Sequence, residues 1–332
     1  MDLNPTTRSS TWTSDLVEEA AKTELTAPVV IISYKRGGNA SSIKLLKNTN
    51  IPVFLFVYDD DFENYKAEVE NTNIKVILCP SKEFRGAAKK RDFVQENMYK
   101  MGFKEYFVLD DDITKLYYTV DGVTKAGKYK AQKVELDPEK FFKTWLYTIH
   151  SLDYEPALGG IVSEASSWCQ DLHKISASNK FGRVCQIVYI NAEKFNEYNI
   201  KYCEVNSWDD FDVMLQVLDN GLNLSCISWL TYSGDTMTPK KSVASGGDYT
   251  WTKKSMRLYQ KWGDCVGFKK DKGQLNTTIN WAKIKKQLKT SGKLNKDLRE
   301  DWKKYFSLEP TADNPHGLDY EGFTKLWDMT TQ

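Results

Sequence analysis

The chain has 332 residues, of which 41% are hydrophobic and 27% charged, with a formal net charge of +1. This composition excludes a wholly disordered chain, and the length allows one enlarged α/β domain with an appendage. No stretch approaches the roughly 20 apolar residues that span a bilayer, and the polar start lacks a signal-peptide core. We therefore expect a soluble, cytoplasmic protein with no membrane contact.

The first half of the chain alternates apolar runs with helical segments. An N-terminal arm covers residues 1–26, with a short helix predicted over 16–22. Strands are predicted over 28–33, 51–58, 74–78 and 106–109, and helices over 40–48, 61–70 and 86–101. This alternation predicts β-α-β units and a Rossmann-like, mostly parallel α/β sheet.

The second half continues the pattern and then changes composition. We predict a helix over 138–152, strands over 157–162, 184–190 and 222–230, and a helix that opens at 207–212 and ends before Asn220-Gly221. Further helices are predicted over 278–290 and 296–306. The expected organisation is the arm, an α/β domain over 27–237, and a basic, mainly helical C-terminal region over 238–332.

The C-terminal region is strongly basic. Residues 238–304 hold eighteen lysines and arginines against six acidic residues. Its aromatic residues, among them Tyr249, Trp251, Tyr259, Trp262 and Trp281, are interleaved with lysines. Such a pattern is typical of nucleic-acid binding, with phosphate contacts beside stacking surfaces. The alternative is a lysine-coated helical cap whose aromatic side chains form a core.

An acidic triplet, Asp110, Asp111 and Asp112, follows the apolar run Tyr106-Phe107-Val108-Leu109. Three adjacent carboxylates are costly to hold together unless a cation neutralises them. If the strand continues, Asp110 and Asp112 share a face and offer oxygen ligands to Mg²⁺ or Mn²⁺. The alternative is a solvated acidic turn.

Polar loops at the carboxyl ends of the predicted strands form the expected binding crevice. Basic residues there could neutralise a diphosphate that a metal also bridges. No Walker loop or Gly-x-Gly-x-x-Gly follows the first strand, so neither a P-loop nor a standard dinucleotide site is indicated. The six cysteines and three histidines are scattered, so Ser–His or Cys–His chemistry is not indicated either. The predicted nucleotide-site residues are Tyr34, Lys35, Arg36, Asp59, Arg85, Gly86, Arg91, Asp110 and Asp111.

A second acidic cluster, Asp209, Asp210 and Asp212, lies at a predicted helix N-terminus beside Trp208. The helix dipole stabilises carboxylates there, and capping alone explains one of the three. A carboxylate facing a nucleotide site could deprotonate an acceptor hydroxyl as a general base. Asp210 is the first candidate for this role and Asp209 the second.

Together, Ile31–Arg36, Gly86-x-x-x-x-Arg91, Phe107–Ile113 and Trp208-Asp209-Asp210 resemble the GT-A class of nucleotide-sugar glycosyltransferases. The resemblance implies that Asp110 and Asp112 are the metal-binding Asp-x-Asp pair and that the later acidic motif supplies the base of an inverting reaction. More narrowly, residues 28–265 look like the TET-associated glycosyltransferases of bacteriophages, with arabinosyltransferase-like members nearest.

This family resemblance implies a metal-dependent enzyme that moves a sugar from a UDP-sugar, such as UDP-arabinose or UDP-glucose, to a hydroxyl of a modified DNA base such as 5-hydroxymethylcytosine. The base would be flipped out of the duplex, and Trp168, Trp208 and Trp251 are the candidates to hold it. If the protein is phage-encoded, the reaction would take place in the cytoplasm of a host cell. Many relatives add a C-terminal histidine ligand; the C-terminal histidine here is His316, and Asp248 or water could replace it. No protein partner is indicated.

Other readings of the sequence stay open. The same catalytic fold could act on a protein or a glycan, and a nucleotidyltransferase also pairs carboxylates with a metal. A non-catalytic nucleotide- or DNA-binding module is the alternative outside the enzymes.

Overall fold

The structure is a computed structural model that describes residues 11–122, 130–163, 177–202, 208–235, 251–271 and 274–297. The chain forms two compact units. The first consists of Met1–Ile200 with Leu222–Val243, and the second of Lys201–Gly221 with Ala244–Gln332. In the described residues no helix is long and apolar enough to cross a membrane.

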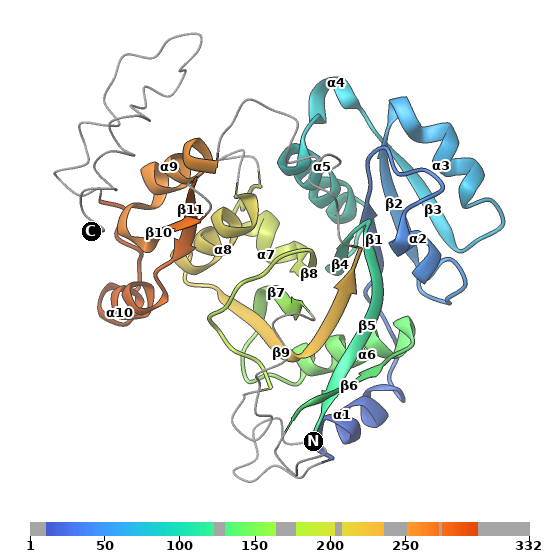
Figure 1. Cartoon of the computed structure of the whole chain (residues 1–332), viewed down its shortest axis with the longest axis horizontal. Helices are drawn as coiled ribbons and strands as arrows, with labels where there is room; N and C mark the ends of the chain where they lie inside the picture. The colour runs from blue at the N-terminus through green and yellow to red at the C-terminus, as the bar shows by residue number, and fades with distance from the viewer. Residues whose placement is uncertain are drawn as a thin grey trace. The chain divides into compact units, whose positions relative to one another are not determined.

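A nine-stranded sheet forms the centre of the first unit, in the order β3-β2-β1-β4-β8-β7-β9-β5-β6 (Figure 1). Strands β8 and β5 run antiparallel to their neighbours, and the other strands share one direction. The predicted α/β class with a mostly parallel sheet is therefore confirmed. The strands are β1 Val29–Ile32, β2 Val53–Tyr58, β3 Ile74–Cys79, β4 Glu105–Asp110, β5 Ile113–Val120, β6 Gln132–Glu135, β7 Pro156–Ser163, β8 Ile187–Asn191 and β9 Asn223–Gly234.

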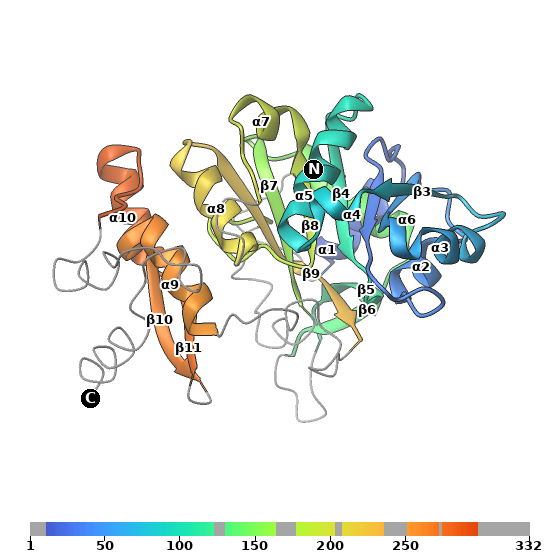
Figure 2. The same ribbon diagram turned by 90° about the horizontal axis from the view of Figure 1, so that it is seen from above.

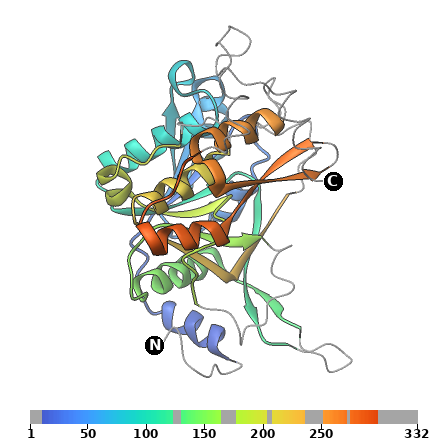
Figure 3. The same cartoon turned by 90° about the vertical axis from the view of Figure 1, so that its left-hand side faces the viewer.

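Helices cover both faces of this sheet because successive strand residues point to opposite sides. On one face Phe107 of β4 packs against Trp145 of α6, with ring centroids 5.0 Å apart, and α1 lies beside α6 (Figure 3). On the other face Phe56 of β2 contacts Phe93 of α5 at 6.1 Å. The helices of this unit are α1 Trp12–Ala20, α2 Ser41–Leu46, α3 Phe62–Glu68, α4 Ser81–Phe84, α5 Ala87–Lys100, α6 Pro138–His150 and α7 Ala192–Glu197, with a 3₁₀ turn η1 at Asp59–Asp61.

The N-terminal helix and one sheet edge differ from the predictions. Helix α1 begins at Trp12, before the predicted 16–22, and Trp12 and Leu16 are buried in the main core. The Trp12 ring meets Trp229 of β9 edge-on at 5.6 Å. Strands β5 and β6, which complete the sheet after the acidic triplet, were not predicted. The arm therefore contributes to the core through one face of α1.

The second unit contains α8 Asp209–Asp219, α9 Trp251–Trp262, a 3₁₀ turn η5 Gly263–Cys265, the hairpin β10 Val266–Asp271 and β11 Gln274–Ile279, and α10 Trp281–Ser291 (Figure 2). The prediction of a helix from residue 278 was wrong at its start, because Thr278 and Ile279 pair with β10. Asn280 then caps α10 by accepting a hydrogen bond from the Lys283 N–H at 3.2 Å. Most of the predicted helix over 296–306 lies outside the described residues.

Candidate functional site

The carboxyl ends of β1, β2 and β4 meet at one edge of the sheet. Ile32 of β1 pairs with Phe56 of β2 on one side and with Asp110 of β4 on the other. The start of α5 adds Gly86 to Arg91 to the same edge, through contacts to β1, β2 and β4. Tyr34, Arg36, Arg85, Arg91 and the acidic triplet are thus brought together by this part of the fold.

The acidic triplet forms a turn between two strands. Strand β4 ends at Asp110 and β5 begins at Ile113. The buried Ser42 of α2 fixes the turn, since its hydroxyl donates to the Asp110 carbonyl at 2.6 Å and accepts from the Ile113 N–H at 3.0 Å. Strand alternation therefore does not extend through the triplet, and a shared face for Asp110 and Asp112 cannot be argued from it.

Each carboxylate of the triplet has different partners. Asp110 pairs with Arg91 of α5 at 3.0 Å. Asp111 accepts from the Ser33 hydroxyl at 2.5 Å and pairs with Arg36 at 3.2 Å. Asp112 lies 4.0 Å from Arg36, its residue is 7% exposed, and its buried Oδ1 has no hydrogen-bond partner in the part of the chain that the structure describes.

Electrostatics single out Asp112 within the triplet. Burial raises the pKa of its carboxyl, and the neighbouring Asp111 raises it further, against the lowering effect of Arg36. An ionised Asp112 is therefore held at a cost, and a cation at its Oδ1 would offset that cost.

The loops after β1 and β2 are joined by polar and aromatic contacts. The Arg85 guanidinium donates to the Tyr34 hydroxyl at 3.3 Å and pairs with Asp60 at the same distance. The Lys35 ammonium lies 5.2 Å from the centre of the Tyr34 ring. Asp59 accepts from Ser81 at the start of α4, and these hydrogen bonds lower the pKa of Asp59. Asp59 thus holds the loop between β3 and α5.

Gly86 and Tyr58 define the entry to α5. Gly86 has a φ of 111° immediately before the helix, a conformation that side-chain-bearing residues rarely adopt. Its N–H donates to the Tyr58 hydroxyl at 3.0 Å, and that hydroxyl donates to the Phe84 carbonyl at 2.9 Å. Burial raises the pKa of Tyr58 to about 12, so the hydroxyl keeps the proton that it donates.

Lys90 is a site residue that sequence reasoning missed. Its side chain is enclosed at this edge, 2% exposed, and donates to the Ser33 carbonyl at 2.5 Å. Burial lowers the pKa of Lys90 to about 8. The available signal was its position four residues before Val94 and eight before Met98, on the buried stripe of the helix.

The donor set suits a hard divalent cation, because carboxylate oxygens are the ligands that Mg²⁺ and Mn²⁺ prefer. The unpartnered Oδ1 of Asp112 fits such a role. Among the described residues no cluster of three or more acidic, histidine or cysteine side chains is arranged to hold a metal. The alternatives for a further ligand, Asp248 and His316, lie outside those residues, as does Trp168.

The second acidic cluster starts α8 in the second unit. Asp209 and Asp210 occupy the first turn of that helix, and Trp208 before them stacks on Phe211 with centroids 5.5 Å apart. Asp212 is fully buried and accepts from Lys261 and Trp262. It serves packing within the unit, while the role of Asp209 or Asp210 as general base stays a prediction.

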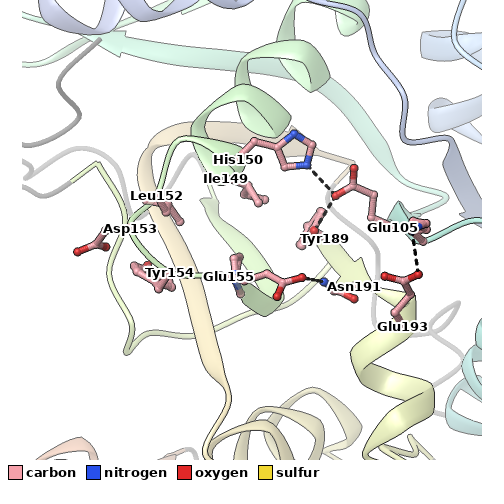
Figure 4. A pocket seen from close by; sticks show the side chains of 12 residues that line it. Glu105, Ile149, His150, Leu152, Asp153, Tyr154, Glu155, Tyr189, Asn191 and Glu193 are labelled. Carbon is pink, nitrogen blue, oxygen red and sulfur yellow. Dashed lines mark hydrogen bonds and ion pairs between the residues drawn. The ribbon is translucent and has the colours of Figure 1, made fainter.

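A pocket of about 520 Å³ lies where β4 begins, at the opposite end of the strand from Asp110 (Figure 4). Glu105 there accepts from the Tyr189 hydroxyl at 2.8 Å and bonds His150 at 2.9 Å. Glu155 accepts from Asn191 at 2.9 Å. Glu105 and Glu155 are satisfied by protein groups, whereas Asp112 at the triplet edge has a buried oxygen with no hydrogen-bond partner among the described residues. The pocket is therefore a lesser candidate than the triplet edge.

An α/β sheet with interleaved acidic and basic side chains at its carboxyl edge is typical of enzymes that bind phosphate-bearing nucleotides there. The chain belongs to the TET-associated glycosyltransferase family, whose family model matches residues 27–246. It is therefore a member of a glycosyltransferase family, as the sequence motifs predicted.

Other comparisons add distant likenesses. No curated protein matches the sequence. Among solved structures, a CMP:2-keto-3-deoxy-manno-octonic acid synthetase complexed with CTP is similar at 13% identity and a TM-score of 0.37, covering 64% of this chain and 94% of that one. An inositol-1-phosphate CTP transferase from T. maritima is similar at 10% identity and a TM-score of 0.34, covering 67% and 96%.

Proposed function

We propose that this protein transfers a sugar from a nucleoside diphosphate sugar, UDP-linked, to a hydroxyl of a modified DNA base such as 5-hydroxymethylcytosine. Family membership supports the transfer of a sugar. The observation that carries the donor site is the pairing of the acidic triplet with Arg36 and Arg91 at one sheet edge. Arginine forks suit phosphate oxygens, and the carboxylates suit the accompanying cation.

In this proposal Asp110 and Asp112 would hold Mg²⁺ or Mn²⁺, and the ion would supply positive charge that stabilises the diphosphate as a leaving group. Arg36 and Arg91 bind phosphate oxygens. A bond forms between the acceptor oxygen and the anomeric carbon while the bond from that carbon to the diphosphate breaks, and the nucleoside diphosphate leaves. The acceptor proton passes to Asp210 or Asp209 if the reaction inverts the anomeric centre.

The DNA acceptor is supported by charge on the second unit. Exposed lysines follow one another on and after α10, namely Lys285, Lys286, Lys289, Lys293 and Lys296. Tyr259 and Trp262, which the sequence offered as stacking surfaces, are 1% exposed and belong to the core of this unit. Any base stacking therefore falls to other aromatic residues, while the lysines provide phosphate contacts.

The test is an assay with purified protein, Mg²⁺ or Mn²⁺, UDP-glucose or UDP-arabinose, and DNA with or without 5-hydroxymethylcytosine. Mass spectrometry of the digested nucleosides should show one added sugar on the modified base alone. Addition of a nucleotide would indicate a nucleotidyltransferase, and transfer to a glycan or protein but to no DNA would refute the acceptor. DNA affinity that does not change with salt would also count against a DNA-binding second unit.

A further inference from the structure

Lys90 is a buried lysine at the edge of the sheet where the donor is proposed to bind. Its ammonium group donates to the Ser33 carbonyl at 2.5 Å and lies 4.0 Å from the centre of the Tyr58 ring. Lysine is almost never fully buried unless its charge is compensated. The Lys90 ammonium therefore provides a buried positive charge next to the loop that follows β1.

Ser33 connects this lysine to the rest of the site. The Ser33 hydroxyl donates to Asp111 at 2.5 Å and lies 2.6 Å from the Tyr65 hydroxyl. The Tyr65 hydroxyl in turn accepts from the Arg36 N–H at 2.9 Å. Lys90 therefore anchors the start of the 33–36 loop through its carbonyl, and Tyr65 anchors the end of the loop through the backbone of Arg36.

We propose that Lys90 is a positioning residue of the donor site, which holds the 33–36 loop in the shape that presents Tyr34 and Arg36 to the diphosphate. This inference rests on the function proposed above. With 2% of its surface exposed, the side chain acts through the loop and not by touching the donor.

The charge of Lys90 also responds to its surroundings. Burial lowers its pKa to about 8, and Cys79, Asp111, Asp60 and Asp61 raise it against that effect. The Tyr58 ring faces the ammonium from β2. A neutral amine still donates to the Ser33 carbonyl but loses the charge-assisted part of that bond and the attraction to the ring. An anionic diphosphate nearby favours the protonated form, so binding above pH 8 takes up a proton.

The experiment measures nucleotide binding by calorimetry in Mg²⁺ for the wild-type protein, Lys90→Met and the control Lys89→Met, whose lysine is exposed on the same helix. The probes are UDP, CDP, GDP and ADP. We expect wild-type and Lys89→Met proteins to bind one of them about threefold more weakly at pH 8.5 than at pH 7.5, a range below the ionisation of the nucleotide bases. Titrations at pH 8.5 in buffers of different ionisation enthalpy should show proton uptake. Lys90→Met should bind at least tenfold more weakly at pH 7.5, without the proton uptake.

The outcomes separate the two proposals. Failure of the wild-type protein to bind any of the four nucleotides refutes the proposed donor site and this inference with it. Wild-type binding that Lys90→Met reproduces, with a lowered melting temperature alone, refutes the inference and leaves the donor site standing. If Lys90→Met does not fold, Lys90→Arg and the wild-type protein decide between the outcomes. The arginine keeps its charge, so nucleotide binding by Lys90→Arg should not change over this pH range. Absence of proton uptake by the wild-type protein overturns the inference.

Discussion

Asp212 offers the sharpest test of how the second unit is held together. Its carboxylate is fully buried. One oxygen accepts from Lys261 at 2.7 Å and from the Trp262 indole at 2.6 Å, and the other accepts from the Gln216 amide at 2.9 Å. The bonds from Lys261 and Trp262 join α8 to the end of α9, across 49 and 50 residues of sequence, while the Gln216 bond lies within α8.

Replacing Asp212 with leucine removes all three acceptor contacts. The Trp262 N–H and the Gln216 amide then lose an acceptor, at about 1–3 kcal/mol for each buried group. Lys261 keeps 25% of its side-chain surface in water, so its charge is partly relieved by solvent. We expect Asp212→Leu to destabilise the unit by about 3–5 kcal/mol, the range for breaking a buried pair. Asp212→Asn keeps an acceptor oxygen and should cost less, about 1–2 kcal/mol.

Hydrogen exchange read by mass spectrometry can follow α8 and α9 separately from the large sheet. For Asp212→Leu, protection of peptides from these helices should fall on the order of 10²- to 10³-fold, since 1.4 kcal/mol is a factor of ten. Exposed Asp297 provides a matched control as Asp297→Asn. Protection within about 1 kcal/mol of the wild-type value in Asp212→Leu would refute the reasoning, because the three donors would then not depend on this carboxylate.

Three further predictions concern the first unit. Burial and Asp111 raise the pKa of Asp112 above its unfolded value, so its ionisation opposes folding once the pH exceeds 3.8. Asp112→Asn should therefore melt at a higher temperature than the wild-type protein at pH 7, yet lose sugar transfer. A lower melting temperature would contradict this. Ser42→Ala should cost about 1–3 kcal/mol in denaturant unfolding, since the buried Ile113 N–H loses its acceptor; an unchanged midpoint counts against the turn assignment. The hydrogen bond with Glu105 raises the pKa of His150. The pair therefore stabilises the fold fully below pH 6.5, and this stabilisation is lost as the pH rises through the folded pKa. Because the His150 side chain is 52% exposed, the effect is under about 1 kcal/mol, and His150→Asn should flatten the curve of stability against pH in that range.

Local patterns were enough to predict the strands that are buried on both faces. The runs at β1, β2 and β4 are continuous and apolar, so their identity as buried strands follows from composition, and their parallel direction follows from the intervening helices. Strand β5 was not predicted because its buried residues, Ile113, Leu116 and Thr119, recur at every third position and do not alternate as in a typical half-buried strand. It also pairs with β9, more than a hundred residues away. Such a partner cannot be identified from the neighbouring sequence.

The candidate site was predicted at the level of loops and not of contacts. The triplet was placed correctly at the end of a strand, but its turn depends on Ser42, 68 residues earlier in the chain. Lys90 was missed because a lysine on a helix is ordinarily a surface residue, and its burial depends on how α5 lies against the ends of β1 and β2. Contacts set by packing between distant segments are what the sequence patterns cannot supply.

The pairing of acidic and basic groups at this edge also bears on how a donor would bind. Arg91 is paired with Asp110, and Arg36 with Asp111 and Asp112. A diphosphate that drew these arginines away would leave partly buried carboxylates without compensation, which costs several kcal/mol. A cation bound alone would likewise compete with Arg36 and Arg91 for the same carboxylates. A metal–diphosphate complex supplies both partners at once, so the proposed site favours metal and nucleotide together over either ion by itself.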